Sequence, residues 1–340
     1  MLPKKLATEK EVLANSLEES RDFLETEFKV SYFDTSLKDI EIFEDGAVTA
    51  EGKSWPYTPC FMESLAKKIR MPMHYAYRID FDLFKKNFDI RKQLECTGVK
   101  LCISHGVAIN VCKTIYSPAR SVDIINNLPE KMKDWNLHEV RLGDMGVEIS
   151  WCNDMITVEP RQGDTILGGV RLSNSETGFR GLKASVFTLR LACLNGAIFS
   201  DEQQVVRWSH DRRMTYSKNI DNFCKELNLL EIPQAELTRI YSNVLERHIS
   251  DKEIVNLWRR IRRVVEPQIV DLMLGIGSRE RQELFDHVRE REDPFVSEAT
   301  RLNTYEIHNR ITAAAKDHSL IKRRRLEEIG GNLICSLPLN

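Results

Sequence analysis

The sequence predicts an α+β protein: a mixed helix-and-sheet N-terminal region with glycine-punctuated strands, followed by an all-helical C-terminal region. Short runs of alternating apolar and polar residues lie between about residues 30 and 199, as in half-buried strands. Glycines separate these runs, whereas the chain has no glycine from residue 214 until Gly275. In that stretch apolar residues recur every three or four positions, which is typical of amphipathic helices. We therefore expect an α+β domain over residues 1–214 and a helical domain over residues 215–340.

In the N-terminal quarter the sequence predicts a β-hairpin with one helix before it and two helices after it. A polar helix with a thin apolar stripe is expected over residues 6–28, and an Asp-Gly turn within residues 40–48 indicates a β-hairpin. Thr58 precedes apolar residues at helical spacing, so we expect a helix that begins there and ends before Pro72. A further helix is expected over residues 80–88.

The middle and the end of the chain follow the same rules. Residues 99–112 and 138–158 each hold two alternating runs, and glycines mark the turns between them. Ser117-Pro118 opens a helix between these two pairs of strands. The last helix is expected over residues 304–329, with Asn303-Thr304 as its cap and Gly330-Gly331 as its stop.

Composition limits the classes of function. The chain has 340 residues, 42% of them hydrophobic, which is enough for a real core. Its formal net charge is −2, so binding to nucleic acid or acidic lipid requires a local basic patch. The eight cysteines are scattered in apolar surroundings, as expected of reduced thiols. Because neither a signal peptide nor an apolar span is evident, a cytoplasmic location without a membrane partner is expected.

Two groups of short motifs resemble a known family. One group lies between Gly168 and Asn195-Gly196, and the other begins at Thr304. They are similar to the SNSE-x-G, R-x-x-C-x-N-G and Y-x-x-x-N-x-x-T signatures of domain-of-unknown-function family 932. The matching residues are Ser173, Asn174, Ser175, Glu176, Gly178, Arg190, Cys193, Asn195, Gly196 and Asn309. An Asn-Arg pair departs from the family's usual Asn-Ala. The resemblance implies a protein of phages, plasmids or other mobile elements, and it implies no particular activity.

The motif residues have both functional and structural interpretations. Ser173 to Glu176 offer hydroxyl, amide and carboxylate groups that could grip a phosphate, a base edge or a cation, or could form a hairpin turn. Arg190 could pair with Glu176 if their strands are antiparallel neighbours. Cys193 fits a small buried residue better than a nucleophile, and Asn195-Gly196 fits a turn or a cap.

Metal and catalytic patterns are weak. Cys102 and His105, with Cys96 and Cys112, lack the spacing of zinc sites, and strand alternation places the first two on opposite faces. No complete catalytic motif is present, so we predict no catalytic residue, no metal and no cofactor.

Three basic clusters carry the leading hypothesis. Two of them mix arginine with tryptophan, and the third is Lys322 to Arg325. Arginines bind phosphates and indole rings stack on unpaired bases, so we expect a non-catalytic, homo-oligomeric protein that binds single-stranded DNA in replication or recombination. The alternative is that these arginines pair with neighbouring carboxylates. The expected contact residues are Arg207, Trp208, Arg212, Arg213, Arg259, Arg260, Arg262 and Arg263.

Two other classes of function stay open. A metal-dependent nuclease could use Asp154, Glu159, Asp164 or Glu176, although such carboxylates are more often solvated. A non-enzymatic protein could instead bind a host or phage protein through its C-terminal helices.

Overall fold

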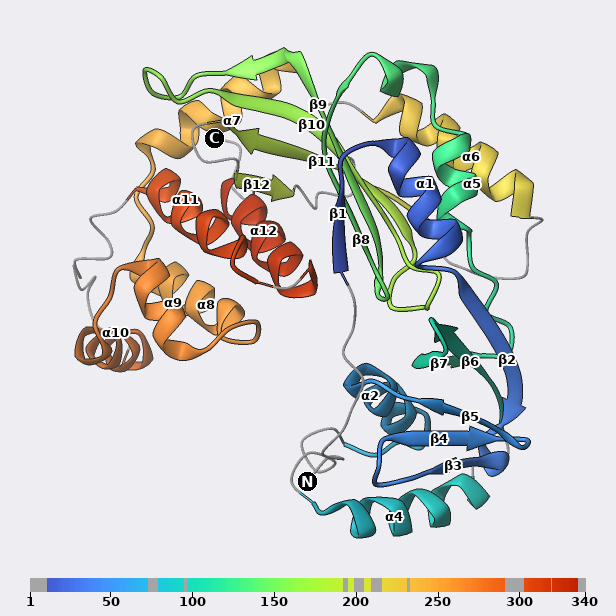
Figure 1. The fold of residues 1–340 in the computed structure, drawn as a ribbon. Coiled ribbons are helices and arrows are strands. Elements are labelled where there is room, and N and C mark those ends of the chain that lie inside the picture. The colour runs from blue at the N-terminus through green and yellow to red at the C-terminus, as the bar shows by residue number, and fades with distance from the viewer. Residues whose placement is uncertain are drawn as a thin grey trace.

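The computed structural model describes residues 11–72, 79–94, 97–191, 195–198, 205–208, 216–230, 233–290, 303–318 and 320–335. Within these residues, three β-sheets occupy the N-terminal and central parts of the chain, and helices dominate the C-terminal part (Figure 1). The predicted α+β class with a helical C-terminal part is confirmed. No described helix combines the length and the apolar character needed to span a bilayer.

The largest sheet has seven strands, and every pairing in it is antiparallel. Its order is β1-β8-β9-β10-β11-β12, and β13 also pairs with β11. The strands are β1 (Glu11–Ala14), β8 (Asn136–Gly143), β9 (Gly146–Val158), β10 (Ile166–Asn174), β11 (Leu182–Arg190), β12 (Asn195–Ile198) and β13 (Val205–Trp208). The strands predicted within residues 138–158 are therefore confirmed as β8 and β9.

Strand alternation gives this sheet one apolar face and an opposite, more polar face, which carries charged side chains together with a small buried apolar cluster. Trp151, Val170 and Leu172 enter the largest hydrophobic core, whereas Glu148 and Arg171 belong to the opposite face. The apolar face packs against α1 (Leu17–Thr26), α5 (Ser121–Asn126) and α6 (Tyr216–Leu229), and α7 (Gln234–Glu246) adds side chains to the same core. The polar face is covered by α12 (Leu320–Cys335), which packs beside α11 (Thr304–Ala315).

Two three-stranded sheets share a second core with two helices. The first sheet has the order β2-β6-β7 and the second the order β3-β4-β5. Their elements are β2 (Val30–Ser36), η1 (Leu37–Asp39), β3 (Ile40–Ile42), β4 (Ala47–Ala50), β5 (Lys53–Pro56), α2 (Pro59–Lys68), α4 (Phe81–Leu94), β6 (Gly98–Ser104) and β7 (Val107–Lys113). Both predicted hairpins and both predicted helices of this region are confirmed, and Thr58 Oγ1 caps α2 by accepting from Phe61 N at 3.3 Å.

A third core lies within the C-terminal helices. It joins α8 (Asp251–Ile261), α9 (Pro267–Leu274) and α10 (Ser278–Glu290) to parts of α11 and α12. The domain boundary predicted near residue 215 falls at residues 209–215, outside the described part of the chain, and α6 is described from Tyr216 onward. Because α6 and α7 pack into the core of the large sheet, the C-terminal helices are divided between two cores. A short helix, η2 (Glu130–Lys133), completes the described elements.

The helix predicted over residues 6–28 is wrong for residues 11–14, and residues 6–10 lie outside the described part. Residues 11–14 form β1, and the helix begins at Leu17. Ser16 Oγ caps it by accepting a hydrogen bond from Glu19 N at 3.0 Å. The strand forms because β8 offers unpaired backbone groups at its edge, a long-range contact that local apolar spacing does not encode.

The helix predicted over residues 304–329 is wrong as a single element, because it is divided into α11 and α12. The Asn303 cap is confirmed, since its Oδ1 accepts from Glu306 N at 2.9 Å. Gly330 does not end α12, which continues to Cys335. A Cβ atom at Gly330 would lie 2.9 Å from Thr312 Cγ2, so this glycine allows α12 to approach α11 closely.

Candidate functional site: a cationic cleft

A cleft of about 1630 Å³ lies between the small-sheet region and the C-terminal helices. One wall comes from α2 and β7, and the other from α12 and residues 263–264 after α8. The turns at residues 143–145 and 178–180 of the large sheet join the two walls. The volume exceeds the roughly 300–1,000 Å³ of small-molecule pockets, so the cleft has room for a segment of a polymer.

Cationic side chains dominate the lining of this cleft. Nine lysines and arginines face three glutamates, Glu11, Glu63 and Glu328. The cations are Lys67, Lys68, Arg70, Lys113, Arg180, Arg263, Lys322, Arg324 and Arg325. Because the whole chain has a net charge of −2, this is a local concentration of positive charge. A concave wall of one sign focuses the field and attracts polyanions.

Most of these cations are not neutralised by any carboxylate in the part of the chain that the structure describes. Within the described residues, six of them have no salt bridge to a carboxylate: Lys67, Lys68, Lys113, Arg263, Lys322 and Arg325. All of the six are exposed except Lys68, which is half-buried. Local structure explains part of the set. Lys67 and Lys68 occupy the last turn of α2, where the helix dipole favours cations, and Lys113 ends β7.

The Ser173–Gly178 segment ends β10 with Ser173 and Asn174 and continues into the turn toward β11, so the hairpin turn that the sequence suggested begins only at Ser175. Its side chains also bind other segments of the fold. Asn174 Nδ2 donates to Ala119 O at 2.7 Å, and the Glu176 carboxylate accepts from Ser121 N at 2.8 Å. Burial raises the pKa of Glu176. Ser173, Asn174 and Ser175 are at most 1% exposed, so they stabilise the fold and do not face a ligand.

The end of the same turn reaches the cleft. Gly178 has a φ of +85°, which residues other than glycine rarely adopt, and a Cβ atom here would clash with Cys112 Sγ. Both the backbone conformation and the lack of space therefore require glycine at this position. Phe179 and Arg180 follow it and line the cleft. Tyr116 also lines the cleft, and its hydroxyl donates to Ser175 O at 2.7 Å. Two half-buried aromatic rings therefore stand among the cations.

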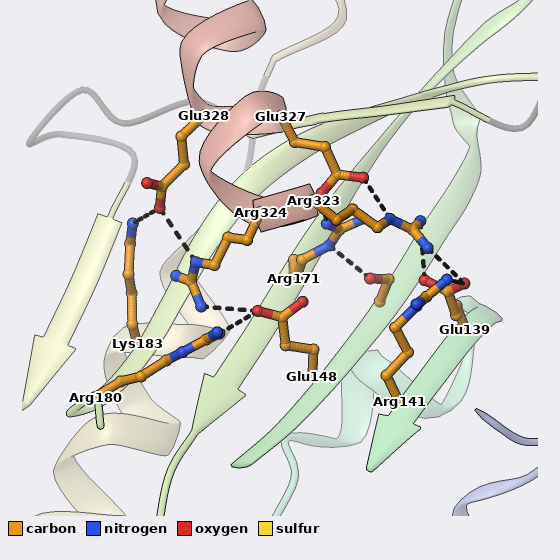
Figure 2. A network of polar contacts seen from close by, with 11 residues as sticks. Glu139, Arg141, Glu148, Arg171, Arg180, Lys183, Arg323, Arg324, Glu327 and Glu328 are labelled. Atoms are coloured by element: carbon orange, nitrogen blue, oxygen red, sulfur yellow. Dashed lines mark hydrogen bonds and ion pairs between the residues drawn. The ribbon is translucent and has the colours of Figure 1, made fainter. Parts of the chain in front are cut away.

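The wall formed by α12 is fastened to the sheet by ion pairs (Figure 2). Arg171 of β10 pairs with Glu327, and these two side chains are 3% and 1% exposed. Glu148 of β9 accepts from Arg180 and Arg324. Burial alone would raise the pKa of Glu148, but the two guanidinium groups lower it to about 2.

The Lys322–Arg325 cluster is divided by its helix. Arg323 pairs with Glu139 at 3.1 Å, and Arg324 pairs with Glu328 at 3.2 Å (Figure 2). Lys322 and Arg325 are exposed at the cleft. Successive helical residues point in different directions, so one basic run supplies both buried ion pairs and free cations.

Among the predicted nucleic-acid contact residues that the structure describes, Arg263 lines the cleft. Arg259, Arg260 and Arg262 are exposed on α8 and at its end, outside the lining, and Arg207 is exposed on β13 opposite Lys183. Arg212 and Arg213 lie outside the described residues.

The tryptophans of these clusters belong to hydrophobic cores. Trp258 is 5% exposed, and its Nε1 donates to Asp271 Oδ1 at 2.8 Å. Trp208 is half-buried and packs against the core of the large sheet. Exposed Arg262 nevertheless lies over the Trp258 ring, 5.4 Å from its centroid, whereas the aromatic side chains that line the cleft are Phe179 and Tyr116.

The expected pair of Arg190 with Glu176 is wrong. β10 and β11 are antiparallel neighbours, but Arg190 stands opposite Ile166, at the far end from the turn. Its guanidinium pairs with Asp164, at 2.9 Å for Nη2 to Oδ2, and the Tyr305 hydroxyl donates to the same carboxylate.

The remaining motif residues lie apart from the cleft. Asn309, half-buried on α11, hydrogen-bonds to the Tyr305 side chain. Asn195 and Gly196 begin β12, so the expected turn at these residues is wrong, and Cys193 lies outside the described part. The described motif residues therefore serve mainly as internal contacts.

The four carboxylates considered for a nuclease each bind a different partner and do not form a common site. Asp154 accepts from Asn136 Nδ2 at 2.6 Å, Glu159 accepts from Gly163 N, and Asp164 and Glu176 have the partners given above. Nowhere in the described ranges do three His, Cys, Asp or Glu side chains form a group that could hold a metal ion. Cys102 faces Cys112, His105 stacks edge-on against Phe28, and Cys96 lies outside those ranges.

The sequence analysis pointed to Arg263 and to the Lys322–Arg325 cluster, but it did not find the cleft residues of α2, of β7 and of the turn before β11. These residues come from three short segments, which hold Lys67 and Lys68, Lys113, and Phe179. None of the three segments has enough charged residues to form a recognisable basic cluster in the sequence. Their only local signal is position, at the end of a helix, a strand or a turn. No family model, no curated protein and no solved structure matches this chain, so the geometry of the cleft is the basis for assigning a function.

Proposed function

We propose that this protein binds single-stranded nucleic acid in the cationic cleft. The observation that carries the proposal is a set of six cations that have no carboxylate partner among the described residues and that surround a concavity of about 1630 Å³. Phosphates are the natural counter-charges for such a lining, since lysine and arginine contacts to the backbone release condensed counterions.

The aromatic rings favour a single strand over a duplex. Phe179 and Tyr116 are half-buried at the cleft, where an unpaired base can stack on an exposed ring face. A duplex hides its base faces and would gain only the phosphate contacts. The resemblance to phage and plasmid proteins agrees with such a role in replication or recombination.

A salt titration of binding tests the proposal. Fluorescence anisotropy would measure the affinity of the protein for labelled oligothymidylate, with a duplex of the same length as comparison. Affinity should fall steeply with salt, and the double variant Lys67→Ala/Lys113→Ala should reduce the salt slope by about one per lysine. Phe179→Ala should weaken binding of the single strand more than that of the duplex.

The matched control is Lys133→Ala/Arg279→Ala, which removes the same charge outside the cleft. Both side chains are exposed, and each pairs with a neighbouring glutamate within its own helix. This control should bind like the wild type. Equal losses in the two double variants, or no binding at low salt, would contradict the proposal.

A further inference from the structure

Two thiols are in contact at the point where Cys112 lines the cleft. Cys102 of β6 and Cys112 of β7 stand diagonally across the hairpin, since Cys102 is opposite Asn110. The pairing of the two strands shifts between Cys102 and Ile103, and the two sulfur atoms lie 3.5 Å apart in a hydrogen bond. Cys102 is fully buried, whereas Cys112 is 7% exposed and lines the cleft.

The surroundings of Cys112 favour its thiolate. The hydrogen bond with Cys102 lowers the pKa of Cys112, burial opposes this effect, and the ammonium groups of Lys68 and Lys100 add to it. Other described cysteines behave differently: burial raises the pKa of Cys152 to about 12 and that of Cys224 to about 11. A thiolate with access to solvent and a second thiol in contact are what a redox-active pair requires.

We propose that Cys102 and Cys112 form a reversible dithiol–disulfide pair that reacts with hydroperoxides entering through the cleft. The Cys112 thiolate attacks the peroxide, the O–O bond breaks, and a sulfenic acid forms as hydroxide or alkoxide leaves and takes a proton. Cys102 Sγ then attacks the sulfenic sulfur, so that a disulfide forms and water leaves with the Cys102 proton. The two sulfurs supply the two electrons that reduce the peroxide.

The roles of the two cysteines follow from their positions. Cys112 meets the oxidant because it lines the cleft, and Cys102 resolves the intermediate because it is buried against Cys112. A small dithiol reverses the reaction by thiol–disulfide exchange. This chemistry does not depend on nucleic-acid binding, so either proposal can fail without the other.

The sequence makes the test direct. Both cysteines lie in one tryptic peptide, residues 101–113, because Lys100 and Lys113 flank it. The reduced full-length protein is treated with hydrogen peroxide, unfolded, alkylated and digested for mass spectrometry. Peptide 101–113 should appear without alkyl groups and lighter by two hydrogens, and dithiothreitol before alkylation should restore the doubly alkylated form.

Variants and an unfolded control complete the test. Cys102→Ser should leave a sulfenic acid at Cys112 that dimedone captures, Cys112→Ser should abolish both products, and Cys152→Ser should behave like the wild type. Wild-type protein in urea should form the disulfide at least tenfold more slowly. An equal rate in urea, or a peptide that stays doubly alkylated while Cys224 is oxidised, would overturn the proposal without any variant.

Discussion

The arginines of α8 and of α12 look alike in sequence but have opposite surroundings. Arg259, Arg260 and Arg262, on α8 and at its end, are exposed, while Arg323 and Arg324 of α12 are only 4% and 8% exposed. The inner face of α8 is apolar and packs into the third core. α12 instead lies on the polar face of the large sheet, where Glu139 and Glu148 form ion pairs with its arginines (Figure 2). Whether an arginine of a basic run stays exposed thus depends on the face that its own side of the helix meets.

The largest expected effect tests the buried side of this comparison. Glu327→Gln leaves the Arg171 guanidinium buried without its counter-charge, so we expect a loss of about 3–5 kcal/mol in the free energy of unfolding. Arg260→Gln on exposed α8 should change it by less than about 0.5 kcal/mol. Urea denaturation measures both values.

A double replacement sharpens the same result. Arg171→Met/Glu327→Met removes both charges and should recover most of the loss, because apolar substitutes for a buried ion pair are often neutral. If Glu327→Gln were as mild as Arg260→Gln, the ion pairs would not be what holds α12 to the sheet.

The next effect concerns the packing of α12 against α11. Gly330→Ala places a methyl group 2.9 Å from Thr312 Cγ2, and the resulting strain should cost about 1–3 kcal/mol. Gly277→Ala, between α9 and α10, meets no atom within 4 Å and should be neutral or slightly stabilising. Thermal unfolding of the two variants compares them, and equal melting temperatures would show that α12 can move away from α11 at little cost.

A third effect depends on pH. Burial lowers the pKa of His308, on α11, to about 4, whereas an unfolded chain gives about 6.5. The unfolded state binds more protons within that window, so stability is complete above about pH 6.5 and falls toward pH 4, by at most about 1.4 kcal/mol per unit. His308→Gln should flatten this part of the profile. An unchanged slope in urea titrations across the window would assign it to other groups.

The smallest effect tests the exposed side. Arg263→Ala removes one cation from the cleft and should reduce the salt slope of oligothymidylate binding by about one, whereas Arg260→Ala should leave it unchanged. Anisotropy titrations of these two neighbouring variants give the answer. A larger effect from Arg260→Ala would move the nucleic-acid site onto the outer face of α8.

Much of the fold could be predicted because it follows local rules. The hairpin at residues 40–48 has its Asp-Gly turn, α2 has its Thr58 cap, and α11 has its Asn303 cap. Contacts between distant segments overrode those rules elsewhere. β1 formed on the edge of β8, and Gly330 served helix packing where a helix stop was expected.

The sequence by itself determined the α+β class, most of the hairpins and several helix caps, because each depends on neighbouring residues. Only the tertiary structure decided which cations are free. Lys67, Lys113 and Arg263 come from three separate segments and meet at the cleft. Arg323 instead pairs with Glu139 and Glu327, and Arg324 pairs with Glu148 and Glu328. Whether a charge faces solvent or a counter-charge depends on the element packed against it, and that information is not local.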